Sequence, residues 1–309
     1  MAHDTNGGLP TRVLGKTGVP VSILGLGGWH IGALKEEAEA IALMHAAMDQ
    51  GLTFFDNSWD YHDGRSEELM GKALEMDGRR SRVFLMTKNC NRDNAGSMKC
   101  LEDSLLRLKT DYIDLWQFHE CIYDNDPDWI FERGGIEAAI EARRQGKVRF
   151  IGFTGHKDPR IHLNMLSKPF DWDATQMPVN VMDTVYRSFQ REVLPECLRR
   201  NIGVIGMKGL GGGYPQGQFP KSAGLSADES YRFALSQQIS VQVSGMISME
   251  QLRQNLAMAR AFQPMSQEEQ SALLARLRDH AGDGRHELFK CTERFDGPYH
   301  VKQHGFDIV

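Results

Sequence analysis

Segments with strand-like and helix-like character alternate along almost the whole chain. Eight short apolar runs are each followed by a stretch in which apolar residues recur with helical spacing. Strands separated by helices form a parallel sheet with right-handed crossovers, and eight such units close a barrel. We therefore predict an α/β fold, a (β/α)8 TIM barrel. An open doubly wound sheet is the alternative.

The element boundaries follow from the same pattern. A hairpin around the turn Gly15-Lys16-Thr17-Gly18 is expected before the first barrel strand, because turn residues there separate two extended runs. The later strands are predicted at 53–55, 83–87, 113–118, 148–154, 174–177, 204–207 and 241–243. The helices are predicted at 36–49, 66–74, 97–108, 136–144, 159–166, 190–199, 227–236 and 248–261. We expect one domain over 1–309, in which 265–309 forms a C-terminal helix and tail.

Composition narrows the classes of partner. The chain has 309 residues, 41% of them apolar, with a net charge of -5 and a pI near 6.1. This net negative charge gives no indication of a basic surface that would bind nucleic acid or an anionic membrane. Apolar runs are too short to span a bilayer, which needs about 20 residues. Five scattered cysteines without a CxxC pair indicate reduced thiols rather than disulfides or a zinc ribbon. We expect a cytoplasmic protein with a small-molecule partner.

Polar side chains follow three consecutive predicted strands. Asp56 ends the run before a loop that contains Tyr61, Lys88 ends the next run, and His119 ends the one after. Because parallel barrel strands all point the same way, residues just past their C-terminal ends converge on one face, the mouth of the barrel. The sequence therefore predicts that these four groups meet there.

The stretch around the first two of these residues carries a family resemblance. It reads TFFDNSWDYHDGRSEE over 53–68, in which Ser66 is expected to cap a helix and the two following glutamates suit its dipole. This resembles the aldo-keto reductase signature, with Asn57 and Ser58 in place of the usual threonine and alanine. The resemblance extends from the Leu14-Gly15 hairpin to Asn255 and implies that Asp56, Tyr61, Lys88 and His119 form a catalytic tetrad.

The implied reaction is carbonyl reduction. Hydride addition to a carbonyl carbon leaves an alkoxide, and a phenol with a pKa of about 10 gives up its proton reluctantly. The ammonium of Lys88 is expected to lower the pKa of Tyr61, while Asp56 holds Lys88 in place. Tyr61 would then be the general acid, and His119 would hydrogen-bond the carbonyl oxygen.

A nicotinamide cofactor is implied because none of the tetrad groups can deliver hydride. NADP is expected from the family, with NAD as the alternative, since neutral residues stand at positions where NADP-selective members usually carry Lys or Arg and only Arg253 is close in sequence. The residues that the resemblance assigns to cofactor binding are Trp29, Thr154, Gly155, Gln176, Met207, Lys208, Leu210, Gly211, Gly245, Met246, Gln251, Gln254 and Asn255.

The pocket for a carbonyl substrate is expected to be lined by aromatic side chains and shaped by the C-terminal tail. The residues expected to line its pocket are Trp29, His30, Trp59 and Tyr123. No metal is predicted, because His300 and His304 stand in the tail without a carboxylate partner and the cysteine spacings offer no cage. Two other readings remain: a nucleotide-binding regulatory or interaction subunit with little turnover, and a metal-dependent barrel hydrolase.

Overall fold

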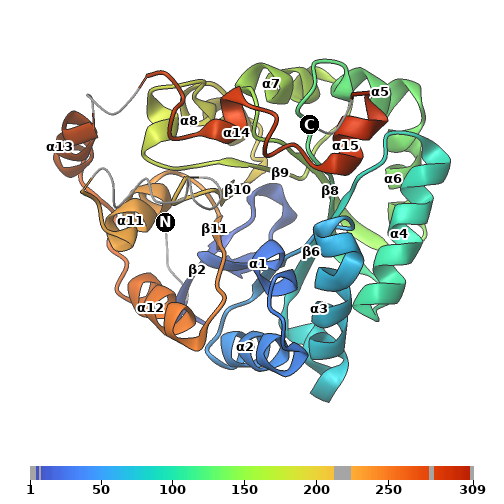
Figure 1. Cartoon of the computed structure of the whole chain (residues 1–309), viewed down its shortest axis with the longest axis horizontal. Helices are drawn as coiled ribbons and strands as arrows, with labels where there is room; N and C mark the ends of the chain where they lie inside the picture. Colours follow the sequence, from blue (N-terminus) through green and yellow to red (C-terminus); the bar gives the residue numbers. More distant parts are fainter. Residues whose placement is uncertain (1–4, 7, 212–223, 278–281, 307–309) are drawn as a thin grey trace.

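Eight parallel strands close into a barrel surrounded by helices (Figure 1). The computed structural model describes residues 5–6, 8–211, 224–277 and 282–306. Around the barrel the strands follow the order β10-β11-β4-β5-β6-β7-β8-β9. The predicted (β/α)8 architecture is confirmed, and closure of the sheet excludes the open doubly wound alternative.

The elements have the following bounds. The barrel strands are β4 (Leu24–Gly27), β5 (Phe54–Asp56), β6 (Phe84–Asn89), β7 (Ile113–Phe118), β8 (Val148–Thr154), β9 (Ala174–Pro178), β10 (Gly203–Met207) and β11 (Val241–Ser244). The helices within and around the barrel are α1 (Gly28–Gly32), α2 (Glu37–Asp49), α3 (Arg65–Glu75), α4 (Asn94–Leu108), α5 (Asp126–Glu132), α6 (Gly135–Arg144), α7 (Pro159–Ser167), α8 (Phe189–Glu192), α9 (Leu194–Arg199), α11 (Ala227–Ser236) and α12 (Met249–Arg260). The C-terminal helices are α13 (Gln267–Leu277), α14 (Leu288–Cys291) and α15 (Pro298–Gln303), and the 3-10 turns are η1 (Gly15–Thr17), η2 (Tyr61–Gly64), η3 (Met76–Arg82) and η4 (Met182–Thr184).

The N-terminal hairpin closes the end of the barrel opposite the mouth. Strands β2 (Leu9–Val13) and β3 (Pro20–Ser22) pair antiparallel, as predicted, and β1 (Thr5–Asn6) adds a third strand. Leu14 and Val21 pack in one buried cluster with Phe54 and Phe84, the first residues of β5 and β6. The hairpin therefore seals the base, and the strand C-termini remain as the functional face.

Two predicted helices differ in detail. Ser66 is not a cap, because α3 begins at Arg65 after Gly64 in the left-handed region, and the Ser66 hydroxyl donates instead to the Gly28 carbonyl at 2.7 Å. The helix predicted over 190–199 is divided into α8 and α9 near Pro195, which has no amide hydrogen to donate within a helix. The C-terminal helix predicted within 265–309 is observed as α13, and residues 278–281 lie outside the described part of the chain.

The C-terminal segment lies over the barrel near α5, α7 and α8 (Figure 1). The fully buried ammonium of Lys290 binds Asp183 at 2.6 Å, Glu287 at 2.7 Å and the Tyr186 carbonyl at 2.8 Å. Farther along, the Tyr299 hydroxyl accepts from Asn91 Nδ2 at 2.9 Å. The segment is thus held to the loops at the mouth by polar contacts. None of the helices in the described part of the chain combines the length and the apolar character that spanning a bilayer requires.

Candidate active site

Three adjacent strands bring the predicted acidic, basic and imidazole groups together. Asp56 is the last residue of β5, Lys88 lies near the end of β6, and His119 follows β7 directly. The His119 amide still pairs with the Asn89 carbonyl at 2.8 Å, so the imidazole is carried by the edge of the sheet itself. All three residues are 5% exposed or less. The convergence predicted from the strand ends is therefore observed.

Lys88 links two members of this group. Its Nζ contacts the Asp56 carboxylate, donates to the Asn57 carbonyl at 2.6 Å and donates to the Tyr61 hydroxyl at 3.2 Å. An ammonium has three donors, and all three are used. Lys88 is consequently fixed in direction and directs its charge at the phenol oxygen.

Tyr61 is held by a strained turn and by an aromatic neighbour. It opens η2, in which His62 and Asp63 have φ values of 51° and 55°. Such values are unfavourable for residues with a Cβ and persist where the surroundings enforce them. The Trp29 ring contacts Tyr61 edge-on at 5.3 Å between centroids, and His62 Nε2 lies 2.8 Å from the Trp29 carbonyl oxygen. The turn and α1 therefore hold the phenol beside Lys88.

The expected lowering of the Tyr61 pKa is wrong for this structure. Burial raises the pKa of Tyr61 well above its ordinary value, and the carboxylates of Asp56, Asp60 and Glu120 raise it further. A single ammonium does not outweigh burial together with three negative charges. Tyr61 is thus a neutral phenol that carries its proton.

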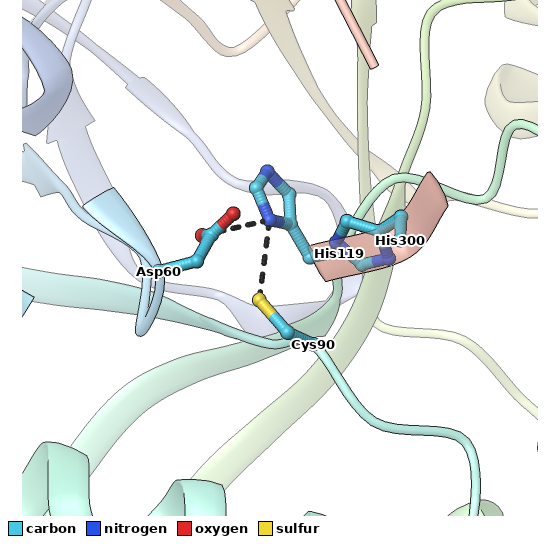
Figure 2. A group of neighbouring side chains, drawn as sticks. All are labelled: Asp60, Cys90, His119 and His300. Atoms are coloured by element: carbon cyan, nitrogen blue, oxygen red, sulfur yellow. Dashed lines mark hydrogen bonds and ion pairs between the residues drawn. The ribbon is translucent and has the colours of Figure 1, made fainter. Parts of the chain in front are cut away.

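His119 is oriented through one ring nitrogen. Its Nδ1 lies 3.1 Å from Asp60 Oδ1, 3.1 Å from Ser58 Oγ and 3.5 Å from Cys90 Sγ (Figure 2). Although burial alone would raise the pKa of Asp60, the charge of His119 and hydrogen bonds from His119 and Ser58 hold it well below the usual range. A carboxylate beside Nδ1 fixes the ring, as in other sites where a second group orients a histidine.

Several functional neighbours were missed from the sequence. Asp60, Cys90 and Glu120 each stand within two residues of a tetrad member, which is the signal that could have found them. Glu120 has a φ of 43° and accepts from the Gly297 amide at 2.8 Å, and burial raises its pKa to about 7. His300 reaches the site from the tail, its ring centroid 5.3 Å from that of His119. Nothing in the sequence marks that approach.

On the cofactor side, β8 and β9 supply Thr154 and Gln176. Both side chains are buried, and Gln176 Oε1 has no hydrogen-bond partner among the described residues. Burial raises the pKa of Asp56, and the charge of Lys88 and a hydrogen bond from the Gln176 side-chain amide offset part of that rise. Gly155 has a packing role, because a Cβ there would lie 2.3 Å from the Cys121 carbonyl oxygen. An unpaired amide oxygen at the mouth suits a donor on a bound ligand.

The loop after β10 brings a cation to the mouth. Met207 ends β10, and Lys208 follows with a φ of 57° and its Nζ 5.2 Å from the centre of the Phe289 ring. Burial lowers the pKa of Lys208, and the charge of Glu120 raises this pKa again in part. Leu210 and Gly211 follow in a turn, and the glycines at 212 and 213 lie outside the described residues.

The residues after β11 that were predicted to bind cofactor differ in their surroundings. Gly245 packs against His30, since a Cβ there would lie 2.0 Å from the His30 ring. Met246 is fully buried in the main apolar core and presents no side chain to the mouth. The polar residues have local partners: Gln251 accepts from Ile247 at 2.9 Å, Gln254 donates to Glu250 at 3.3 Å, and Asn255 donates to Ser244 at 3.0 Å.

The residues predicted to line the substrate pocket separate into two groups. Trp29 is 51% exposed beside Tyr61, and His30 faces the loop after β11. Trp59 packs edge-on against Tyr299 at 5.3 Å. Tyr123 donates to Asp296 at 3.3 Å. The first pair is open, whereas Trp59 and Tyr123 are covered by the C-terminal segment.

Comparison with known proteins agrees with this geometry. The model of the aldo/keto reductase family matches residues 23–229. The chain is 32% identical to aldo-keto reductase YhdN of Bacillus subtilis over 195 residues, which cover 57% of this chain and 54% of YhdN. It is 31% identical to aldo-keto reductase yakc of Schizosaccharomyces pombe, whose name specifies NADP(+), over 68% of this chain and 64% of yakc. The chain thus spans roughly half to just under two thirds of these curated relatives.

Solved structures share the fold. The holo form of aldo-keto reductase AKR11C1 from Bacillus halodurans superposes with a TM-score of 0.73 at 23% identity, covering 90% of this chain and all of that one. An aldo/keto reductase from Klebsiella pneumoniae, in complex with NADP and acetate, gives 0.68 at 25% identity over 86% and 94% of the two chains. With the matched family model covering most of the barrel, the chain belongs to the aldo/keto reductase family.

Proposed function

We propose that this protein reduces an aldehyde or ketone to an alcohol with NADPH, using Tyr61 as the general acid. The observation that carries the proposal is the 3.2 Å contact between Lys88 Nζ and the Tyr61 hydroxyl in a buried site at the strand ends. The raised pKa of Tyr61 keeps the phenol protonated, the form that a proton donor requires.

The chain's own groups account for the movement of the proton. NADPH, when bound, supplies the hydride that adds to the carbonyl carbon. The carbonyl oxygen takes the Tyr61 proton, which yields the alcohol and leaves a tyrosinate. Lys88 stabilises that anion, and Asp56 keeps Lys88 oriented. Because the Asp60 carboxylate and Ser58 lie at Nδ1 of His119, its Nε2 is the nitrogen left to face the carbonyl oxygen, to which it donates when both ring nitrogens carry protons.

The residues at the mouth fit a nicotinamide nucleotide. The unpartnered Gln176 Oε1 can accept from a carboxamide, with Thr154 beside it at the end of β8. Lys208 and the backbone of Leu210 and Gly211 can meet the pyrophosphate. The related yakc and the Klebsiella pneumoniae structure, which carry NADP in their names, favour NADP over NAD. Trp29, Gly245 and the first turn of α12 complete the proposed binding surface.

We also infer that residues 1–309 act as one catalytic unit in which the C-terminal segment shapes the substrate pocket. Contacts of Tyr299 with Trp59, Asp296 with Tyr123 and the Gly297 amide with Glu120 support this. Trp29, exposed beside Tyr61, is the aromatic wall open to a substrate.

The test follows NADPH and NADH absorbance with a panel of aldehydes and ketones, in the wild type and in Tyr61→Phe. We expect kcat of the variant to fall by about 10² to 10⁴-fold, the range for loss of a general acid. Nucleotide binding, followed by quenching of intrinsic fluorescence, should be retained. Tyr112→Phe, a tyrosine that packs on Arg80 outside the site, is the matched control. Nucleotide binding without consumption for any carbonyl would instead indicate an interaction subunit.

A further inference from the structure

Four metal-binding side chains from separate parts of the chain meet beside the tetrad. Asp60 comes from the loop after β5, Cys90 from the end of β6, His119 from the end of β7 and His300 from α15 (Figure 2). One ligand atom from each lies within 4.8 Å of the other three. We propose that this cluster is a Zn²⁺ site, whose occupation ties the C-terminal segment to the mouth of the barrel.

The spacing is close to what tetrahedral zinc requires. With bonds of about 2.0 Å to nitrogen and oxygen and about 2.3 Å to sulfur, ligand atoms in a site with one sulfur stand about 3.3 to 3.5 Å apart. The His119 Nδ1 atom already lies 3.1 Å from Asp60 Oδ1 and 3.5 Å from Cys90 Sγ. None of the remaining edges exceeds 4.8 Å, so changes of about 1.5 Å or less in these distances complete the tetrahedron.

Hydrogen bonds within the cluster account for the positions of the other residues but not for that of His300. Asp60, Ser58 and His119 satisfy one another, so their contacts need no ion. His300 is fully buried, and neither of its ring nitrogens has a hydrogen-bond partner among the described residues. Its nearest carboxylate oxygen, on Glu120, is 3.8 Å from Nε2, which is beyond hydrogen-bond distance. A buried imidazole without a partner is costly, and a metal would supply one.

The charges at the site also suit a divalent cation. Zn²⁺ would displace the proton of the Cys90 thiol to solvent, and the resulting thiolate together with the Asp60 carboxylate makes the cluster neutral. The two neighbouring cations are already paired, Arg92 with Asp126 at 2.8 Å and Lys88 with Asp56. A thiolate, two imidazoles and a carboxylate form a donor set that favours zinc over magnesium or calcium.

The site leaves the outward nitrogen of His119 free. Figure 2 shows Nδ1 of His119 directed at Asp60 and Cys90, with the other ring nitrogen on the far side of the ring. Metal at Nδ1 would place the ring proton on Nε2. Zn²⁺ binding at this cluster therefore does not depend on the proposed reductase activity.

The experiment uses the full chain, freed of metal with a chelator and kept reduced. We expect one Zn²⁺ per chain by competition with a chromophoric chelator, release of at least one proton, and a rise in Tm. Co²⁺ in place of Zn²⁺ should show a thiolate-to-metal charge-transfer band. Cys90→Ser and His300→Gln should each weaken Zn²⁺ binding by about 100-fold or more, at least as much as loss of an outer-sphere partner does.

Matched controls are Cys121→Ser and His162→Gln, a buried cysteine and a buried histidine outside the cluster, which should bind Zn²⁺ like the wild type. Zinc binding that is unchanged in Cys90→Ser and His300→Gln, or no saturable binding, would overturn the proposal. If either variant unfolds, X-ray absorption of the Zn²⁺-loaded wild type decides: one sulfur ligand supports the site, and a spectrum with only oxygen and nitrogen ligands refutes it.

Discussion

Lys88 Nζ lies 3.2 Å from the Tyr61 hydroxyl oxygen and contacts the Asp56 carboxylate at the same time. This arrangement places one cation between a phenol and a buried carboxylate. Any change at Lys88 therefore alters both the chemistry and the stability of the site, and the two effects can be separated.

Replacing Lys88 with methionine should lower kcat by about 10² to 10⁴-fold, since the tyrosinate loses its cation. It should also destabilise the fold by about 3 to 5 kcal/mol, because buried Asp56 is left without a partner. Urea unfolding and steady-state kinetics measure both effects. Adding Asp56→Asn should restore stability but not turnover. Recovery of turnover in the double variant would show that Lys88 has no chemical role.

Glu120 makes the stability of the protein depend on pH. Burial raises its pKa to about 7 from a usual value of 4.5, so the folded chain binds more protons than the unfolded chain between these values. Stability should thus fall as pH rises from 4.5 to 7 and stay lowered above it, by at most about 3 kcal/mol. Glu120→Gln should reduce this slope. Part of the slope should remain in this variant, because burial also raises the pKa of Glu287 to about 7.

The measurement for Glu120 is the free energy of unfolding in urea at several pH values. Glu250→Gln, at an exposed position in α12, is the control and should leave the slope unchanged. An identical slope in Glu120→Gln and the wild type would count against the raised pKa.

Lys290 anchors the C-terminal segment through two buried carboxylates, Asp183 and Glu287. Lys290→Met should destabilise the protein by about 3 to 5 kcal/mol, because both anions lose their cation. Proteolysis within the segment should also become faster. Lys302→Met, at an exposed position of α15, should change neither property. A stable, protease-resistant Lys290→Met would show that the apolar contacts alone hold the segment.

Arg253 offers an exposed guanidinium in the second turn of α12, near the proposed nucleotide-binding loop. If it binds the 2′-phosphate of NADP, Arg253→Ala should raise KM for NADPH at least about tenfold, the effect of losing a hydrogen bond to a charged group. KM for NADH should not change. Arg260→Ala, on the same helix but bonded to Gln50, is the control. An unchanged ratio of the two KM values would remove Arg253 from the site.

The alternation of apolar runs and helical spacing determined the barrel from sequence. Two strands, 113–118 and 148–154, were predicted to the residue, and the others to within two residues at either end. The strand ends in turn determined that Asp56, Lys88 and His119 would meet, because in a parallel barrel the end of a strand fixes the position of its residue. The spacing of apolar residues shows which side of a local segment is buried. This was sufficient to predict the barrel strands and the residues at their ends.

Only the tertiary structure decided how the loops and the C-terminal tail approach the site and how the surroundings of each charged group shift its pKa. The approach of His300 to His119 joins segments that no local pattern connects. The pKa of Tyr61 was predicted from one neighbouring ammonium, yet burial and three carboxylates set its direction. Desolvation and the sum of nearby charges exist only once the chain is folded, which is why the sequence identified the groups that meet at the barrel mouth but not their ionisation.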